Sequence, residues 1–165
     1  MKKLNKKGFT LVELLAVIVI LALLMVVLVP KAIEAINNSR ANTFVEGYQA
    51  FINTVELKYA EGSLDNATCG DTGTGGDSTT CNEKYGLSTD YTATIKTDGS
   101  VSFSGENGRF KQANIDKFGT YWKETTPEGS SDPVKSCDSD KIQKGATDCY
   151  YTSGTGPTIE GKISF

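Results

Sequence analysis

The acid Glu13 stands out in this sequence because it lies at the start of a long apolar run. From Leu14 to Val29 the sequence has no polar side chain, and a helix from Phe9 to Val29 would be about long enough to cross a ~30 Å hydrocarbon layer. A carboxylate inside such a segment is costly and requires a partner. Cleavage of the chain after Gly8 would supply one, since it creates an amine at Phe9. The pattern therefore predicts a charge pair between Glu13 and a new N-terminus.

The composition argues against an enzyme. The sequence has no histidine, which excludes Ser-His and Cys-His nucleophiles and histidine-ligated metal sites. It also has no carboxylate pair, nucleotide-binding loop or nucleophile motif, so we expect no catalytic residues and no cofactor. The net charge is −3 and the basic residues concentrate at the N-terminus. Nucleic acid is therefore not an expected partner, because phosphate binding favours a basic face.

The residues before the apolar run predict its orientation in a membrane. The run is preceded by four lysines, Lys2, Lys3, Lys6 and Lys7. The positive-inside bias then predicts a cytoplasmic N-terminus and an exported C-terminal bulk. A secretory signal peptide is an alternative, but the run is long for one, Glu13 falls where such peptides are uncharged, and residues 30–35 offer no small-x-small cleavage site. An uncleaved membrane anchor is a further alternative.

Type IV pilins and related pilin-like proteins have a processing site that resembles Lys7-Gly8-Phe9-Thr10-Leu11-Val12-Glu13. The resemblance implies that a dedicated peptidase cuts between Gly8 and Phe9 on the cytoplasmic side and N-methylates Phe9. It also implies that Glu13 meets the Phe9 ammonium of a neighbouring subunit during assembly. Pro30 stands where many members of the family have a proline that bends the helix.

The resemblance implies a structural subunit that leaves the cytoplasmic membrane and polymerises into an extracellular helical filament. Its partners would be other copies of the chain, the prepilin peptidase and methyltransferase, and the pilus assembly machinery. Several alternatives stay open: a pseudopilin of a type II secretion system, a subunit of a DNA-uptake pilus, a minor tip subunit, and a single-pass anchored adhesive module. The task of the filament, whether adhesion, motility, uptake or secretion, is also open.

The chain is expected to form four segments that position these residues. Residues 1–8 are the leader, 9–29 the apolar helix, 30–62 the amphipathic half of the same helix, and 63–165 a globular β-rich domain. Pro30 predicts a kink or local opening rather than an end of the helix. The amphipathic half has an apolar stripe at spacings of mostly three and four, which predicts a buried face: Ile33, Ile36, Phe44, Val45, Tyr48, Phe51, Ile52, Val55 and Tyr59.

The C-terminal part reads mainly as strands, so the expected fold class is α+β with an antiparallel sheet on the helix. Residues 91–96 and 101–104 predict a β-hairpin around the turn signal Asp98-Gly99. Residues 118–124, 149–152 and 158–165 are further expected strands, and residues 109–115 are either a strand or a short helix. Residues 63–84 and 125–140 are expected to be mostly loop.

Four cysteines, Cys69, Cys81, Cys137 and Cys149, can stabilise this domain. Four cysteines allow three connectivities, which sequence alone does not distinguish. Local pairing, Cys69 with Cys81 and Cys137 with Cys149, is preferred because both loops are short and contain glycine or serine. Zinc is disfavoured because no pair has C-x2-C spacing and the domain is expected outside the cell. By resemblance, Cys137 to Cys149 matches a C-terminal disulfide loop frequent in Gram-negative pilins, and the earlier pair departs from that pattern.

Three weaker signals have a simpler explanation. Asp71 and Asp77 could suggest a calcium loop, but no EF-hand spacing supports it and a solvated loop is favoured. Residues 66–68 match an N-glycosylation triplet, a pattern that is common by chance. A set of aromatic residues in expected strands could form an adhesive surface, although cross-strand or core packing is favoured: Tyr121, Trp122, Tyr150 and Tyr151.

Overall fold

A computed structural model of the chain describes residues 9–61, 69–70, 80–96, 98–105, 108–110, 118–131, 134–152 and 156–163. The chain divides into two compact units, Met1–Ile36 and Asn37–Phe165. The helix α1 (Leu11–Ala60) contributes to both units. A long N-terminal helix followed by antiparallel strands confirms the expected α+β class.

The helix α1 continues through Pro30, as the sequence predicted. In the first unit every described residue, from Phe9 to Ile36, is exposed. The expected stripe is therefore wrong at Ile33 and Ile36, and also at Tyr59, which is exposed near the end of the helix. Burial on α1 begins at Ala41 and ends at Val55, the stretch that carries the buried aromatic residues Phe44, Tyr48 and Phe51.

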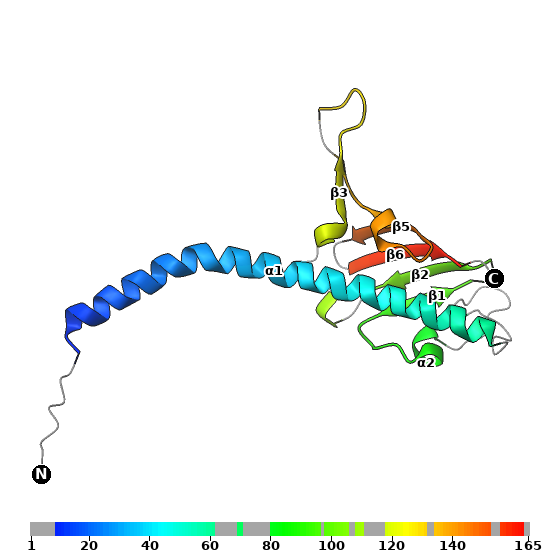
Figure 1. Cartoon of the computed structure of the whole chain (residues 1–165), viewed down its shortest axis with the longest axis horizontal. Helices are drawn as coiled ribbons and strands as arrows, with labels where there is room; N and C mark the ends of the chain where they lie inside the picture. The colour runs from blue at the N-terminus through cyan, green and yellow to red at the C-terminus, as the bar shows by residue number, and fades with distance from the viewer. Residues whose placement is uncertain are drawn as a thin grey trace, which may run out of the picture. The chain divides into compact units, whose positions relative to one another are not determined.

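Four strands of the second unit form one antiparallel sheet in the order β1-β2-β6-β5 (Figure 1). They are β1 (Thr92–Ile95), β2 (Ser100–Ser104), β5 (Ala146–Thr152) and β6 (Gly156–Lys162). The expected hairpin is confirmed, since β1 pairs with β2 across Asp98-Gly99. Gly99 has φ 80°, a left-handed conformation that favours glycine. The Asp98 carboxylate accepts hydrogen bonds from the Ser100 N–H at 2.9 Å and the Ser100 hydroxyl at 2.8 Å.

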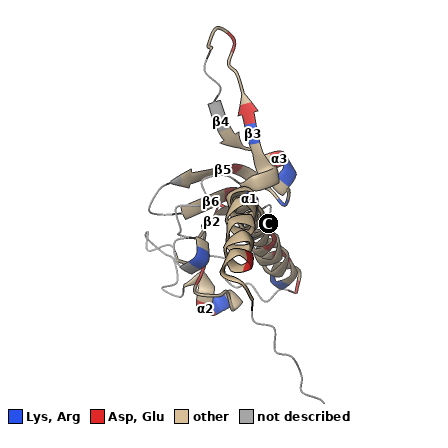
Figure 2. Cartoon of the chain, turned by 90° about the vertical axis from the view of Figure 1, so that its left-hand side faces the viewer, with Lys and Arg blue, Asp and Glu red and all other residues tan. Residues whose placement is uncertain are grey.

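Several expected loops contain short regular elements instead. The end of the expected loop 63–84 is wrong, because α2 (Cys81–Tyr85) begins there. The expected loop 125–140 is also wrong, because β4 (Val134–Cys137) pairs with β3 (Trp122–Thr125) and α3 (Ser139–Ile142) follows. Both views show the β3–β4 hairpin projecting from the rest of this unit (Figures 1 and 2).

One expected strand and one ambiguous segment begin as single helical turns. Residues 118–124 were expected to be one strand, but η2 (Gly119–Tyr121) precedes β3, and the Tyr121 N–H donates to the Phe118 carbonyl at 2.9 Å. The ambiguous segment 109–115 starts with η1 (Gly108–Phe110). Its later residues, 111–115, lie outside the described residues. Pairing with β4, which local pattern does not reveal, decides where β3 begins.

Aromatic rings hold α1 on the inner face of the sheet. Phe103, in the middle of β2, lies with its ring centroid 5.4 Å from that of Phe44, 5.6 Å from Phe51 and 5.9 Å from Tyr48. These three residues recur at helical spacing on one face of α1, so they reach the same point of the sheet. Aromatic pairs at such distances add to the stability gained from burial.

Gly47 lets the helix and the domain approach closely at this point. An added Cβ at Gly47 would lie 2.8 Å from the Tyr91 hydroxyl, too near for any larger residue without movement of Tyr91. The ring centroid of Tyr91 is in turn 4.9 Å from that of Phe103. Glycine costs helix propensity, and packing of Tyr91 explains its presence here.

We predict that the domain loses stability in alkali through Tyr48. Burial first, and the charge of Glu56 second, raise the pKa of Tyr48 to about 12 from an ordinary value near 10. Between these two values the unfolded chain releases the proton and the folded chain keeps it, so stability falls as pH rises through this window and does not change below it. Thermal unfolding as a function of pH should show the loss, with a smaller slope in Tyr48→Phe.

The slope should not vanish in Tyr48→Phe, because burial also raises the pKa of Tyr85 and Tyr91. Tyr121→Phe serves as the matched control, since Tyr121 is only partly buried. If stability fell with pH equally steeply in wild type and Tyr48→Phe, the pKa of Tyr48 would be the same in the folded and unfolded chain.

Candidate functional site

The described chain begins with a capping box that joins Thr10 to Glu13. The Thr10 carbonyl accepts the first intrahelical bond, from the Leu14 N–H at 3.2 Å, which makes Thr10 the N-cap. The Thr10 hydroxyl accepts a hydrogen bond from the Glu13 N–H at 3.3 Å. In return the Glu13 carboxylate accepts from the Thr10 N–H at 2.8 Å. This reciprocal pair satisfies two backbone donors that a helix start leaves without partners.

The same carboxylate can still receive another donor. The Thr10 hydroxyl donates to Glu13 Oε2 at 2.9 Å, and the Thr10 N–H bond also ends on Oε2. An ionised carboxylate has about four lone-pair positions on its two oxygens. Glu13 is therefore held in a defined orientation by its own chain and keeps acceptor capacity for an ammonium group.

Phe9 and Gly8 flank the expected cleavage point. Phe9 is 89% exposed and directly precedes the N-cap. Gly8 lies outside the described residues. The role of Thr10 was not predicted from the sequence, although T-x-x-E before an apolar run is the signature of a capping box.

The segment after Glu13 exposes an apolar surface along its whole length. Among the described residues, α1 is the one helix that is long and apolar enough to cross a membrane by length and composition. Its side chains from Leu14 to Val29 are all exposed within the chain. A surface of this kind marks contact with lipid or with other protein. Pro30 follows this segment inside α1, where it removes one backbone donor from the helix.

The four cysteines form two disulfides in the second unit, Cys69–Cys81 and Cys137–Cys149. The first fixes the chain before β1, because Cys69 also forms a backbone bridge with Ile95 at the edge of the sheet. The second connects β4 with β5, and so ties the small sheet to the large one.

Two side chains of α1 bind the loop enclosed by the second disulfide. The Tyr48 hydroxyl donates to the Lys144 carbonyl at 3.1 Å, and the Gln49 amide donates to the Ile142 carbonyl at 2.6 Å. Lys144 has a positive φ of 55°, which is uncommon for a residue other than glycine. These bonds therefore help to hold the loop in its conformation against α1.

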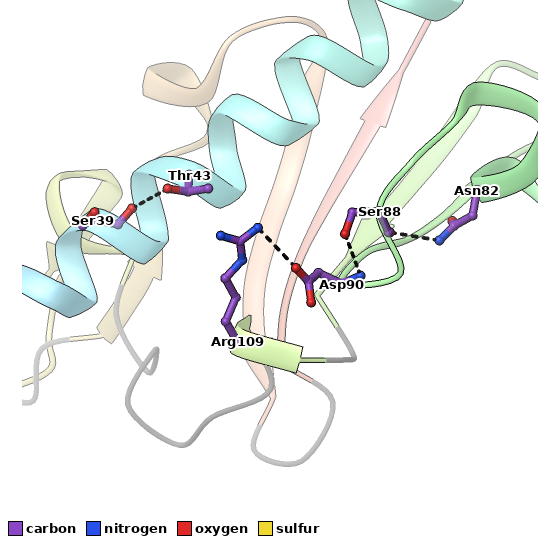
Figure 3. Close-up of polar contacts among 6 residues, drawn as sticks. All are labelled: Ser39, Thr43, Asn82, Ser88, Asp90 and Arg109. Atoms are coloured by element: carbon purple, nitrogen blue, oxygen red, sulfur yellow. Dashed lines mark hydrogen bonds and ion pairs between the residues drawn. The ribbon is translucent and has the colours of Figure 1, made fainter.

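Polar contacts near β1 are structural in character. Arg109 Nη2 lies 3.2 Å from Asp90 Oδ2, and the Asp90 N–H donates to the Ser88 hydroxyl (Figure 3). Asn82 donates to the carbonyls of Ser88 at 3.3 Å and Tyr91 at 2.6 Å. The ion pair is partly exposed, so it adds at most about 1 kcal/mol. Together these contacts fix the loop that enters β1.

The remaining sequence signals give no reaction site in the described part of the chain. No group of His, Cys, Asp and Glu among the described residues could hold a metal ion. Asp71, Asp77 and the triplet 66–68 lie outside these residues. Tyr121, Trp122 and Tyr151 pack against the core, whereas Tyr150 is 42% exposed.

Comparison with known proteins identifies the N-terminal segment. Residues 3–29 match the model of the prokaryotic N-terminal methylation motif, which is the signature of type IV pilin-like prepilins. No curated protein and no solved structure gives a significant match to the chain. The motif and the apolar helix together fit membrane anchoring.

We predict that Thr10→Val loosens the start of α1 while Thr10→Ser does not. Valine is similar in size to threonine but lacks the hydroxyl that accepts the Glu13 N–H, and serine retains it. Hydrogen exchange of the full chain in detergent should show a several-fold faster exchange at Glu13 in the valine variant. Equal exchange in all three chains would contradict the capping role.

We predict that replacing both Cys137 and Cys149 by serine lowers the free energy of unfolding by about 2 to 4 kcal/mol. The loop they close would then gain freedom mainly in the unfolded state. Urea unfolding of the full chain in detergent measures the loss. The variant with Cys69 and Cys81 both replaced by serine is the comparison, because it opens a disulfide loop of equal length. A loss below about 0.5 kcal/mol would mean that the bonds from Tyr48 and Gln49 hold the loop alone.

Proposed function

We propose that this chain is the precursor of a structural subunit of a type IV pilus or a related filament. The N-terminal methylation motif at residues 3–29 carries the proposal. Hydrolysis of the Gly8–Phe9 bond leaves a carboxylate on Gly8 and an amine on Phe9. The nitrogen of that amine then takes a methyl group from an electrophilic methyl donor, such as a sulfonium compound, and releases one proton. The product is a secondary amine, which remains protonated and positively charged at neutral pH.

Before assembly, residues 9–29 hold the subunit in the cytoplasmic membrane. The lysines before Phe9 keep the leader in the cytoplasm, where the prepilin peptidase and methyltransferase act on it. The second unit then lies outside the membrane, an environment in which its two disulfides persist.

During assembly, the pilus machinery moves the apolar helix from lipid into a bundle of identical helices. Water cannot replace the lipid, because exposing the apolar side chains costs on the order of 25 cal/mol per Å². Identical subunits joined by a contact that does not close on itself form a helical filament. The capping box holds the Glu13 carboxylate ready for the Phe9 ammonium of a neighbouring copy, and a buried acid is tolerated when it is paired in this way.

The first test is the N-terminus of the mature protein. Mass spectrometry and N-terminal sequencing of the protein from its native host should find N-methyl-Phe9 as the first residue. Sheared surface material should contain this form as a filament. An intact Met1 would instead favour an uncleaved anchored module, and a new terminus after residue 35 would favour a secretory signal peptide.

The second test separates the charge of Glu13 from its capping role. Glutamine at the same position still accepts the Thr10 N–H and keeps the capping box, but it cannot neutralise an ammonium. Glu13→Gln should therefore be cleaved normally and yield about tenfold less sheared filament, because the Phe9 charge is left unpaired in the apolar core. Thr10→Ser, which keeps both the capping hydroxyl and the acid, is the matched control. Normal filament yield from Glu13→Gln would contradict the pairing of Glu13 with the Phe9 ammonium.

A further inference from the structure

The outer face of the four-stranded sheet carries a polar trough along β2. α1 packs against the inner face, where Val101 and Phe103 are buried. The alternate positions of β2 are all serine: Ser100 and Ser102 are partly exposed, and Ser104 is buried. Serine is smaller than the neighbouring side chains of β1 and β6 in the same rows, which are threonine, lysine and glutamate. The resulting hollow, which spans Ser100 and Ser102, has a volume of about 310 Å³.

Two lysines flank one end of this trough. Strand pairing places Lys96 and Lys162 in one row with Ser100 between them, since the Lys96 N–H donates to the Ser100 carbonyl and Ser100 pairs with Lys162. Both lysines line the hollow. The strands that carry them are two spacings apart, about 9–10 Å, so flexible lysine side chains can reach a single anion between them. Asp98 lies beside this row, and Ser100 donates to both of its carboxylate oxygens.

The middle of the trough presents hydroxyls and one oriented carboxylate. Thr94, Ser102 and Glu160 form the next row across the sheet. Glu160 Oε1 accepts a hydrogen bond from the Tyr150 hydroxyl at 3.1 Å, and the Tyr150 ring is 42% exposed on the same face. A bulge in β5 between Ala146 and Asp148 adds Thr147 to the lining. Bulges commonly redirect a side chain in this way.

From these contacts we infer that the trough binds an acidic saccharide. The paired cations Lys96 and Lys162 bind the carboxylate of the sugar. Its hydroxyls exchange hydrogen bonds with Thr94, Ser102 and the Glu160 carboxylate, and the exposed Tyr150 ring offers an apolar surface to the sugar ring.

Other ligand classes fit the trough less well. An apolar peptide would cover the Ser102 hydroxyl and the Lys162 ammonium without offering a partner to either, which is costly. A nucleic acid backbone carries a phosphate on every nucleotide, and its binding favours an extended basic surface, whereas the trough has one pair of lysines at one end.

The inference goes beyond the filament proposal and does not rest on it, since all the residues named lie in the second unit. If the chain does polymerise, each subunit adds one trough, and repeated weak sites raise the avidity for a polymeric saccharide.

The test uses tetragalacturonate, a uronic acid oligomer with one carboxylate on each sugar, and its fully methyl-esterified form, which has the same sugars without charge. Each is titrated into the full chain in a polyoxyethylene detergent, with binding followed by NMR. We expect a Kd of about 1 mM for the acid and at least about tenfold weaker binding of the ester. Replacing both Lys96 and Lys162 by glutamine should weaken binding of the acid about tenfold, and Lys123→Gln, in the projecting β3 strand, should not.

A variant that fills the trough keeps the test independent of charge. Ser102→Phe places a ring on the trough floor and should abolish binding of the acid, while circular dichroism and the melting temperature report that the domain is folded. The inference is overturned if the acid does not bind, if the ester binds equally well, or if the lysine variants bind as wild type does. Competition by inorganic phosphate at equal concentration would likewise overturn it, as it would define a simple anion site.

Discussion

The apolar surface of α1 from Leu14 to Val29 is the constraint on which the rest of this molecule depends. All of these side chains are exposed within the chain, and the exposure extends over a helix long enough to cross a membrane. A monomer in water cannot sustain such a surface. The chain must therefore occupy lipid or associate with other apolar helices, and every polar group at the beginning of this helix must be satisfied under both conditions.

The Thr10–Glu13 capping box meets that requirement within one chain. A helix start exposes backbone N–H groups that water would otherwise satisfy, and the capping box satisfies two of them without water. Glu13 can therefore serve two purposes at once. Glu13 stabilises the helix start of its own subunit, and its remaining acceptor capacity suits an ammonium group. A side chain without an acceptor oxygen at this position would lose both, whereas glutamine would lose only the charge.

Sequence reasoning identified the faces of the elements better than their ends. The 3.6-residue period from Phe44 to Val55 correctly predicted the buried face of α1. The period alone does not show where the covering sheet stops, so the predicted burial of Ile33 and Ile36 was wrong. Asp98-Gly99 identified the hairpin because turn chemistry is local. The strand β4 was missed because Val134–Cys137 has no alternating apolar pattern and forms a strand only by pairing with β3. The trough depends on register across β1, β2 and β6 in the same way.

Exposed apolar side chains and exposed polar side chains lie on different parts of the described chain. Apart from Leu57, Tyr59 and Tyr150, the large exposed apolar side chains of the described chain all lie between Phe9 and Ile36. The outer face of the sheet carries serine, threonine, lysine and glutamate instead. The globular unit is closed by its own aromatic core and by two disulfides, so its core does not include the exposed apolar segment from Leu14 to Val29. The environment of α1 from Leu14 to Val29 can therefore change without any change in the surface that the sheet presents.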